Sequence, residues 1–135
     1  MFVVDASVVL AWSFADEQSD AADAAVDRLL VDGGIAPAHW PLELAQAIAS
    51  AERRQRIRPT EIPELQAMIT VLPVDIALID LQAAMGRLVD LARMHGVSVY
   101  DAAYVDLALS RGLGLATIDE RLAAACRTVG VPLIV

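Results

Sequence analysis

The sequence predicts an α/β protein with three layers, α/β/α, around a central parallel sheet of four to five strands. Short apolar runs alternate with helical patterns along the chain, which is typical of parallel α/β sheets. The chain has 135 residues, the length of one domain, and neither a repeat nor a low-complexity linker divides it. We therefore expect a single domain over residues 1–135. A hydrophobic content of 57% with 21% charged residues excludes an intrinsically disordered chain.

The predicted strands are short and apolar. Residues 2–5 form a Val-rich run that suits a buried, central position in a parallel sheet. Further strands are expected at residues 35–36, 115–117 and 132–135, and the weakest strand pattern is at 73–74. These five runs, spaced by helical segments, supply the strands of the sheet.

The predicted helices of the first half cover residues 7–14, 16–31, 40–56 and 61–72. Gly33 ends the second of these helices, at a position that favours a left-handed backbone. The third and fourth helices have a proline in or near the first turn, where a missing N–H costs the helix no hydrogen bond.

The predicted helices of the second half have clearer boundaries. Residues 80–95 carry an apolar stripe at the i, i+3, i+4, i+7 spacing, made of Leu81, Ala84, Met85, Leu88, Leu91 and Ala92. Ser98 is expected to cap a helix that runs to Arg111 and stops at Gly112. Asp119 is expected to cap the last helix, which Gly130 ends.

The charge balance is acidic. The formal net charge is −8, all ten basic residues are Arg, and the chain contains no Lys. This argues against a protein that holds nucleic acid by bulk positive charge. A bound divalent cation would invert the local field and make a nucleic-acid substrate compatible with an acidic site.

Cysteine content and hydropathy favour a cytoplasmic protein. The single Cys126 excludes an intramolecular disulfide and a Cys-rich metal site, and it fits a reducing compartment. No stretch approaches 18 uncharged apolar residues, and the first residues carry an early acid and no basic region. We therefore expect no membrane span and no signal peptide.

Four acidic residues are predicted to meet at one edge of the sheet. Asp5 ends the first strand and Asp119 follows the strand at 115–117, and open parallel sheets bind ligands outside the carboxyl ends of their strands. Glu43 and Asp101 fall in the first turns of helices that open at the same edge. A helix cap or a first-turn acid is the simpler interpretation of Asp119 and Asp101.

Together, the four carboxylates point to a metal site. Burying an unpaired acid at the end of a strand costs free energy. Four carboxylates in one place also repel each other unless a cation binds between them. Oxygen-only ligands favour Mg²⁺, with Mn²⁺ as the second choice.

The order and spacing of four motifs resemble a known family. The motifs are Val4-Asp5-Ala6-Ser7, Trp40-Pro41-Leu42-Glu43, Ser98-Val99-Tyr100-Asp101-Ala102-Ala103-Tyr104 and Ala116-Thr117-Ile118-Asp119. In this order they resemble the PIN-domain ribonucleases, and more narrowly the VapC-type toxins of toxin–antitoxin modules, over essentially the whole chain. One position departs from the family pattern, because Gln46 stands where Asn is frequent, which puts a polar role there in doubt.

The resemblance implies a PIN-like fold and a Mg²⁺-dependent endoribonuclease, the toxin of a type II toxin–antitoxin module, which hydrolyses RNA through metal-activated water. The family's acidic quartet corresponds to Asp5, Glu43, Asp101 and Asp119. We expect Asp5 and Asp101 to bind the metal directly, and Asp119 and Glu43 to bind through water or at a second position. Ser7 and Thr117 are supporting candidates that hold carboxylates or waters, unless they are simple backbone caps.

The expected partners are an RNA substrate, a cognate antitoxin and a second copy of the chain. An Arg or Lys from the antitoxin would be attracted to the metal-free acidic pocket, and its helix would lie on apolar surface near Trp12. We expect a homodimer that pairs through residues 80–95 or 61–72. Membrane association and direct DNA binding by the toxin alone are not expected.

Three groups of residues have competing interpretations. His39 and His95 could form a metal-free acid–base pair, although a His at a helix C-terminus is favoured for structural reasons. The cluster at residues 53–58, with four Arg, is either a phosphate contact or a solvated helix end. Trp12 and Phe14 either stack on bases or a partner helix, or pack in the core or a dimer interface.

Other functions remain as alternatives. Receiver-like phosphoacceptors and haloacid-dehalogenase-type phosphatases also place an Asp after the first strand, but both rely on a Lys, which this chain lacks. A Gly-rich phosphate loop is also missing. A catalytically silent PIN-like binding module and an RNA-maturation nuclease of the same fold stay open.

Overall fold

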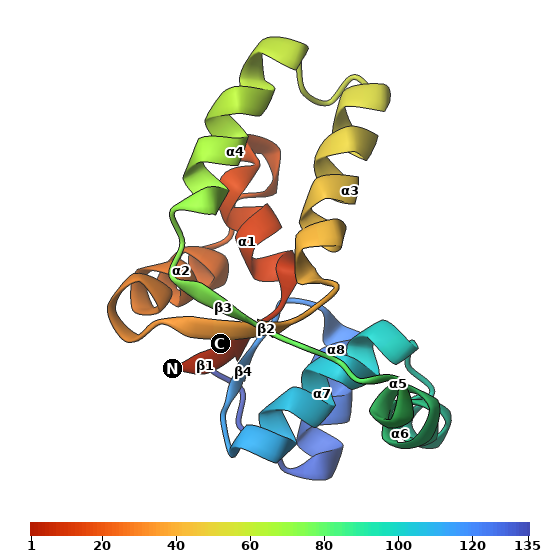
Figure 1. The fold of residues 1–135 in the computed structure, drawn as a ribbon. Helices are drawn as coiled ribbons and strands as arrows, with labels where there is room; N and C mark the ends of the chain where they lie inside the picture. The colour runs from red at the N-terminus through yellow and green to blue at the C-terminus, as the bar shows by residue number, and fades with distance from the viewer.

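The computed structural model describes all residues 1–135 and contains one four-stranded parallel sheet (Figure 1). The strands are β1 (Phe2–Val4), β2 (Gly34–Pro37), β3 (Val74–Ala77) and β4 (Leu115–Ala116). Their order across the sheet is β3-β2-β1-β4, and every pair is parallel. The predicted α/β class with a central parallel sheet is confirmed.

Helices make up most of the chain and lie on both sides of the sheet, with α1, α3 and α4 on one side and α7 and α8 on the other (Figure 1). Their bounds are α1 Ala6–Ser13, α2 Asp20–Asp32, α3 Trp40–Arg53, α4 Ile62–Thr70, α5 Leu81–Ala83, α6 Val89–His95, α7 Val99–Arg111 and α8 Glu120–Val129. No helix is both long and apolar enough to cross a membrane.

The caps predicted for the last two helices are confirmed. The Ser98 hydroxyl accepts a hydrogen bond from the Asp101 amide at 3.0 Å, and Gly112 ends α7 with a φ of 64°. Asp119 Oδ1 accepts bonds from the Arg121 and Leu122 amides at 2.8 and 3.2 Å at the start of α8. These side chains satisfy amides that the first helical turn leaves unpaired.

The prediction of one helix over residues 16–31 is wrong at its start. A short 3-10 turn at Ala15–Glu17 comes first, and α2 begins only at Asp20. Ser19 is the N-cap, because its hydroxyl accepts a bond from the Ala22 amide at 3.3 Å. The serine offers a local cap that competes with continuation of the helix upstream.

Helices α3 and α4 end two to three residues earlier than predicted, and two strands also differ from the predictions. The weak strand at 73–74 is a true edge strand, β3, that extends to Ala77. The strand predicted at 132–135 is reduced to one bridge between Leu133 and Leu115, although two backbone bonds flank it. Pro132 has no N–H to donate, which limits the ladder at this end of the sheet.

The helix predicted over residues 80–95 forms, but it is not regular. Asp80 caps it, and a π-helical turn over Ala84–Leu88 separates α5 from α6. Only Leu88 of the predicted apolar stripe is buried, whereas Leu81 and Met85 are 76% and 65% exposed. Ala84, Leu91 and Ala92 are partly buried, so the periodicity marks an apolar face that stays exposed mainly at Leu81 and Met85.

The main core lies around β1, whose three residues are fully buried, and includes Tyr104 of α7 as its largest fully buried side chain. A smaller core lies toward the far end of the α3–α4 hairpin, formed by Phe14, Ala51 and Leu65. Phe14 is therefore a core residue, and Trp12 packs partly buried against the main core.

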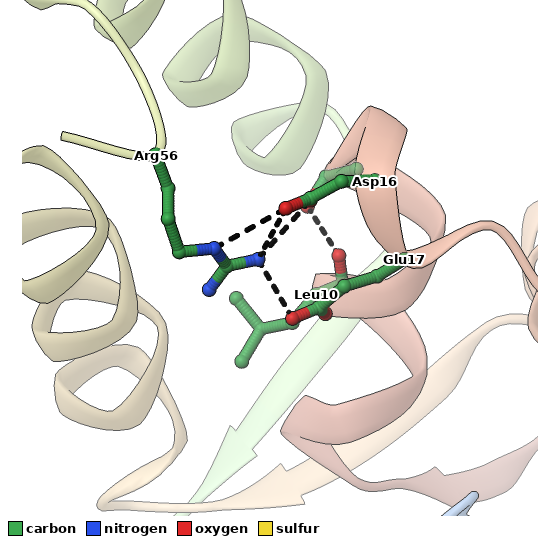
Figure 2. A network of polar contacts seen from close by, with 5 residues as sticks. Leu10, Asp16, Glu17 and Arg56 are labelled. Atoms are coloured by element: carbon green, nitrogen blue, oxygen red, sulfur yellow. Dashed lines mark hydrogen bonds and ion pairs between the residues drawn. The ribbon is translucent and has the colours of Figure 1, made fainter. Parts of the chain in front are cut away.

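Arg56 ties the hairpin to the end of α1 (Figure 2). Its Nη2 lies 3.1 Å from Asp16 Oδ1 and 2.9 Å from Glu17 Oε1, and its guanidinium lies 5.1 Å from the centre of the Phe14 ring. Arg58 pairs with Glu61, whereas Arg53 and Arg54 are exposed and make no ion pair. Half of the Arg cluster is therefore occupied by contacts within the chain.

Candidate active site

The four acids predicted from the sequence stand where the strands and helices open at one edge of the sheet. Asp5 directly follows β1, and Asp119 follows β4, the neighbouring strand. Glu43 and Asp101 lie in the first turns of α3 and α7. In parallel sheets this edge is where ligands bind.

Asp5 is buried, and two hydroxyls hold its side chain. Only 5% of the residue is exposed. Its Oδ2 accepts hydrogen bonds from Ser7 Oγ and, at 2.7 Å, from Thr117 Oγ1. Burial raises the pKa of Asp5, the charge of Glu43 raises it further, and the two hydroxyl bonds oppose both effects.

The same two hydroxyls join the loops that follow β1 and β4. Ser7 Oγ accepts a bond from the Ile118 amide at 3.2 Å, and Thr117 Oγ1 accepts one from the Asp119 amide at 3.0 Å. Ser7 and Thr117 are therefore more than backbone caps, because each also binds the buried carboxylate. Both hydroxyls bind Oδ2 of Asp5, and no side chain donates a hydrogen bond to its second oxygen, Oδ1.

The pKa of Asp101 reflects its burial and the charges of the other three acids. Burial, followed by the charges of Asp119, Asp5 and Glu43, raises the pKa of Asp101 to about 6, and the bond with Ser98 opposes this. The four carboxylates thus lie close enough for their charges to interact. A proton or a cation at this edge relieves their repulsion.

Glu43 is bonded to Tyr104 and lies close to His39, two residues that the sequence did not predict as partners of this acid. The Tyr104 hydroxyl donates to Glu43 Oε1 at 2.6 Å and accepts from the Ala6 amide at 3.4 Å. His39 Nε2 also lies 3.1 Å from the same glutamate oxygen. Burial and the nearby charges of Asp5 and Glu43 raise the pKa of Tyr104, so its hydroxyl remains a proton donor.

One feature of the sequence points to Tyr104 as a site residue: it lies three residues after Asp101 and therefore near the same face of a helix. The sequence singles out His39 only as a possible partner of His95, although its i, i+4 spacing from Glu43 is a signal of contact. His39 and His95 do not form a pair, because His95 lies in a separate depression beside Arg121 and Thr128. The structure therefore offers no metal-free acid–base pair of histidines.

An open groove runs beside Glu43 and Asp101. Its lining contains no basic side chain other than His39, and consists of His39, Leu42, Glu43, Gln46, Ala47, Ser50, Ser98, Tyr100 and Asp101. Gln46 is exposed in this groove and makes no side-chain hydrogen bond within the protein. Asp119 lies outside the groove lining, with one carboxylate oxygen bonded to the start of α8.

The side chains as they stand do not form a ready-made cage for a metal. No group of three or more His, Cys, Asp or Glu side chains is arranged to hold an ion. Three of the four acids have one oxygen occupied by hydrogen bonds from neighbouring groups. The donor set consists of carboxylate oxygens and fits a hard cation that keeps most of its waters and takes one or two carboxylates directly.

Comparison with known proteins fixes the family. Residues 2–128 match the family model of the PIN domain. The chain belongs to the PIN-domain family. The resemblance found in the sequence motifs is therefore confirmed, and the match spans all four acids.

Individual relatives agree with this family. The PIN chain is 35% identical over 125 residues to the Ribonuclease VapC3 of Pyrobaculum aerophilum, an alignment that covers 90% of this chain and 91% of the relative. Its fold is similar to the crystal structure of PAE2754 from the same organism, with a TM-score of 0.68 and 24% identity over 92% of this chain and 83% of that one. It is also similar to FitAcB from Neisseria gonorrhoeae, with a TM-score of 0.58 and 18% identity over 98% and 96% of the two chains.

Proposed function

We propose that this PIN domain is a Mg²⁺-dependent endoribonuclease that acts as the toxin of a type II toxin–antitoxin module. The observation that supports the proposal is the position of four acids, Asp5, Glu43, Asp101 and Asp119, at strand ends and in first helical turns along the ligand-binding edge of the sheet. The charges of the other three acids raise the pKa of Asp101, in agreement with this arrangement. The 35% identity to a protein named Ribonuclease VapC3 supports RNA as the substrate.

Each acid has a part in this function. Asp5 Oδ1 and the Asp101 carboxylate would bind the divalent cation directly, and Asp119 and Glu43 would bind through water or at a second position. A bound Mg²⁺ supplies Lewis-acid stabilisation of the charge on the scissile phosphate. Mn²⁺ has the same ligand preferences and is expected to substitute.

The hydroxyl groups around the acids fix their orientation. Ser7 and Thr117 occupy one oxygen of Asp5 and leave the other available. Tyr104 does the same for Glu43. Carboxylates held in this way bind a cation with little further ordering, which is the usual contribution of residues behind a metal ligand.

Cleavage of RNA with and without metal tests the proposal. The purified protein is incubated with total RNA in Mg²⁺, in Mn²⁺ and in EDTA, and new RNA ends are mapped by sequencing. We expect cleavage only with a divalent cation, and a loss of about 100-fold or more for Asp5→Asn and Asp101→Asn.

Asp90→Asn is the matched control, because Asp90 is an exposed acid of α6 that makes no ion pair. This variant should cleave like the wild type. A protein that binds Mn²⁺ but cleaves no RNA would refute the nuclease and favour the catalytically silent binding module. Confinement of cleavage to defined precursor ends would favour the RNA-maturation nuclease.

A further inference from the structure

We propose that Tyr100 is a nucleobase platform, a residue that positions substrate by stacking on an unpaired base next to the scissile phosphate. The inference rests on the proposed ribonuclease function and adds to it the side chain that would bind a base. It follows from the exposure of the ring, the contacts that hold the ring, and the charge of the groove.

Tyr100 is a large aromatic residue that the fold leaves uncovered beside the acids. It is 63% exposed, although it belongs to α7, whose next residues are mostly buried in the core. It directly precedes Asp101, and both residues line the open groove with Glu43. A base stacked on this ring would bring its flanking phosphate toward the carboxylates.

The ring is held in place by the site itself. Its edge packs against His39, with 5.3 Å between the ring centres and an interplanar angle of 61°. His39 in turn packs edge-on against the buried Tyr104 at 5.3 Å and lies 3.1 Å from Glu43. An aromatic ring ordered before binding loses little conformational entropy when a ligand stacks on it.

Because the groove is acidic, base stacking is the main direct interaction that it can offer to RNA. No Arg lines the groove, and the chain has no Lys. Apart from His39 and a bound cation, phosphates therefore meet no positive group at this place. Stacking does not depend on charge, and every base presents a π face to an aromatic side chain.

The groove that Tyr100 lines also contains neutral polar groups. Gln46, Ser50 and Ser98 line the same groove and offer amide and hydroxyl groups to base edges or to the 2′-hydroxyl of RNA. This mixture of an aromatic face with uncharged donors and acceptors suits a nucleotide better than the continuous apolar surface expected for a protein helix.

A cycle of protein and substrate changes tests the platform. The substrate is a short RNA that contains one cleavage site mapped for the wild type, with each base beside the cut replaced in turn by an abasic residue. We expect Tyr100→Ala to lower kcat/KM by about 5- to 100-fold, mainly through KM, and Tyr100→Phe to retain activity. At one flanking position, the abasic RNA should lower the kcat/KM of the wild type as much as Tyr100→Ala does with intact RNA. The same abasic RNA should not lower the kcat/KM of Tyr100→Ala any further.

Leu109→Ala is the matched control, because Leu109 is an exposed apolar residue of α7 that does not line the groove. It should cleave both RNAs like the wild type. A second readout does not depend on cleavage: RNA with 2-aminopurine at the sensitive position is bound in Ca²⁺, and its fluorescence should be quenched by the wild type and Tyr100→Phe but not by Tyr100→Ala.

The outcomes separate this proposal from the function on which it rests. If the wild type cleaves RNA, but Tyr100→Ala cleaves it and quenches 2-aminopurine fluorescence equally well, the platform is refuted. The exposed ring would then be a contact for a protein partner. If the wild type cleaves no RNA with any divalent cation, the ribonuclease function is refuted, and the platform with it.

Discussion

Asp101 is a residue whose charge opposes folding when no cation is bound. Its pKa is raised to about 6 in the folded protein from an ordinary value of 3.8. An acid with a raised folded pKa destabilises the folded state wherever the acid is ionised, so stability is lost as the pH rises from about 4 through 6. Because Asp101 is only half-buried, solvent screening reduces this effect to the order of 1 kcal/mol.

We therefore predict that Asp101→Asn stabilises the metal-free protein by about 1 kcal/mol at neutral pH and has little effect near pH 4. Urea unfolding at both pH values measures the difference. Saturating Mg²⁺ should stabilise the wild type by roughly 2–3 kcal/mol at about 100 times the dissociation constant, and the variant should lose most of this response.

If Asp101 is only a first-turn acid, the sign reverses. Asp101→Asn would then lower stability by roughly 0.3–1 kcal/mol through the lost interaction with the helix dipole, and cleavage would persist. Asp90→Asn, in the first turn of α6, controls for the loss of a charge away from the site.

Tyr104 acts on the same site through a hydroxyl group. Tyr104→Phe removes the 2.6 Å bond to Glu43 and the acceptor of the Ala6 amide, without changing the packing of the ring. We predict a loss of about 10-fold or more in Mn²⁺ affinity or cleavage rate, and about 1 kcal/mol of stability. Calorimetric titration with Mn²⁺ and thermal melts measure the two effects.

Tyr100→Phe is the matched control for this change, since it removes a tyrosine hydroxyl from α7 without breaking a bond to a carboxylate. It should bind Mn²⁺ like the wild type. Unchanged Mn²⁺ affinity and cleavage in Tyr104→Phe would show that the buried hydroxyl serves only the core.

At the scale of elements, the helical segment from Leu81 to His95 presents an apolar face to solvent. Leu81, Met85 and Met94 are 76%, 65% and 73% exposed, and Leu78 just before the segment is 93% exposed. Several large exposed apolar side chains within one segment are typical of an interface. We propose that the expected homodimer pairs through this segment.

Met85→Glu should therefore convert a dimer to a monomer, because a charge would have to be buried at the interface. Light scattering at tens of micromolar measures the mass. Val71→Glu is the control on the competing α4 side, since Val71 is 73% exposed at the end of α4. A monomeric wild type, or dissociation caused by Val71→Glu alone, would contradict the pairing through residues 81–95.

The elements also show what the sequence alone can predict. Ser98, Gly112 and Asp119 were predicted correctly because caps depend on residues within one turn of each other. The start of α2 and the reduced strand at 132–135 were not, because their ends depend on hydrogen bonds that compete with regular structure. The face of the 80–95 helix was recognised as apolar, but its periodicity could not tell whether the core or a second chain covers it.

The candidate site also has parts that the sequence can predict and parts that it cannot. The topology of a parallel sheet brings acids at strand ends and in first helical turns to the same edge, so this edge could be chosen as the candidate site from the sequence, and its role stays a prediction. The contact of Tyr104 with Glu43 joins two helices through residues 61 positions apart in the sequence, and periodicity carries no such information. His39 and Glu43, in contrast, have the i, i+4 spacing of neighbours on one helix face.

For the whole molecule, the net charge of −8 and the acid-lined groove determine which partner is attracted. We predict that a cognate antitoxin places an Arg or Lys against Glu43 and Asp101 and blocks cleavage. Replacing that basic residue by Ala should restore cleavage in the complex, and a neutral substitution elsewhere in the antitoxin tail should not. Full ribonuclease activity with the antitoxin bound would contradict the prediction.

The bond between Thr117 and Asp5 also bears on synthesis of the protein. It joins residues 112 positions apart, and β1 gains its β4 neighbour only when the last quarter of the chain has docked. At a translation rate of about 5–20 residues per second, the ribosome needs roughly 6–22 s to proceed from the first of these residues to the second. During that interval the nascent chain holds Asp5 without its threonine partner and lacks Asp119, so an incomplete chain carries no assembled site. A truncated product that ends before β4 is therefore expected to be harmless to the cell that makes it.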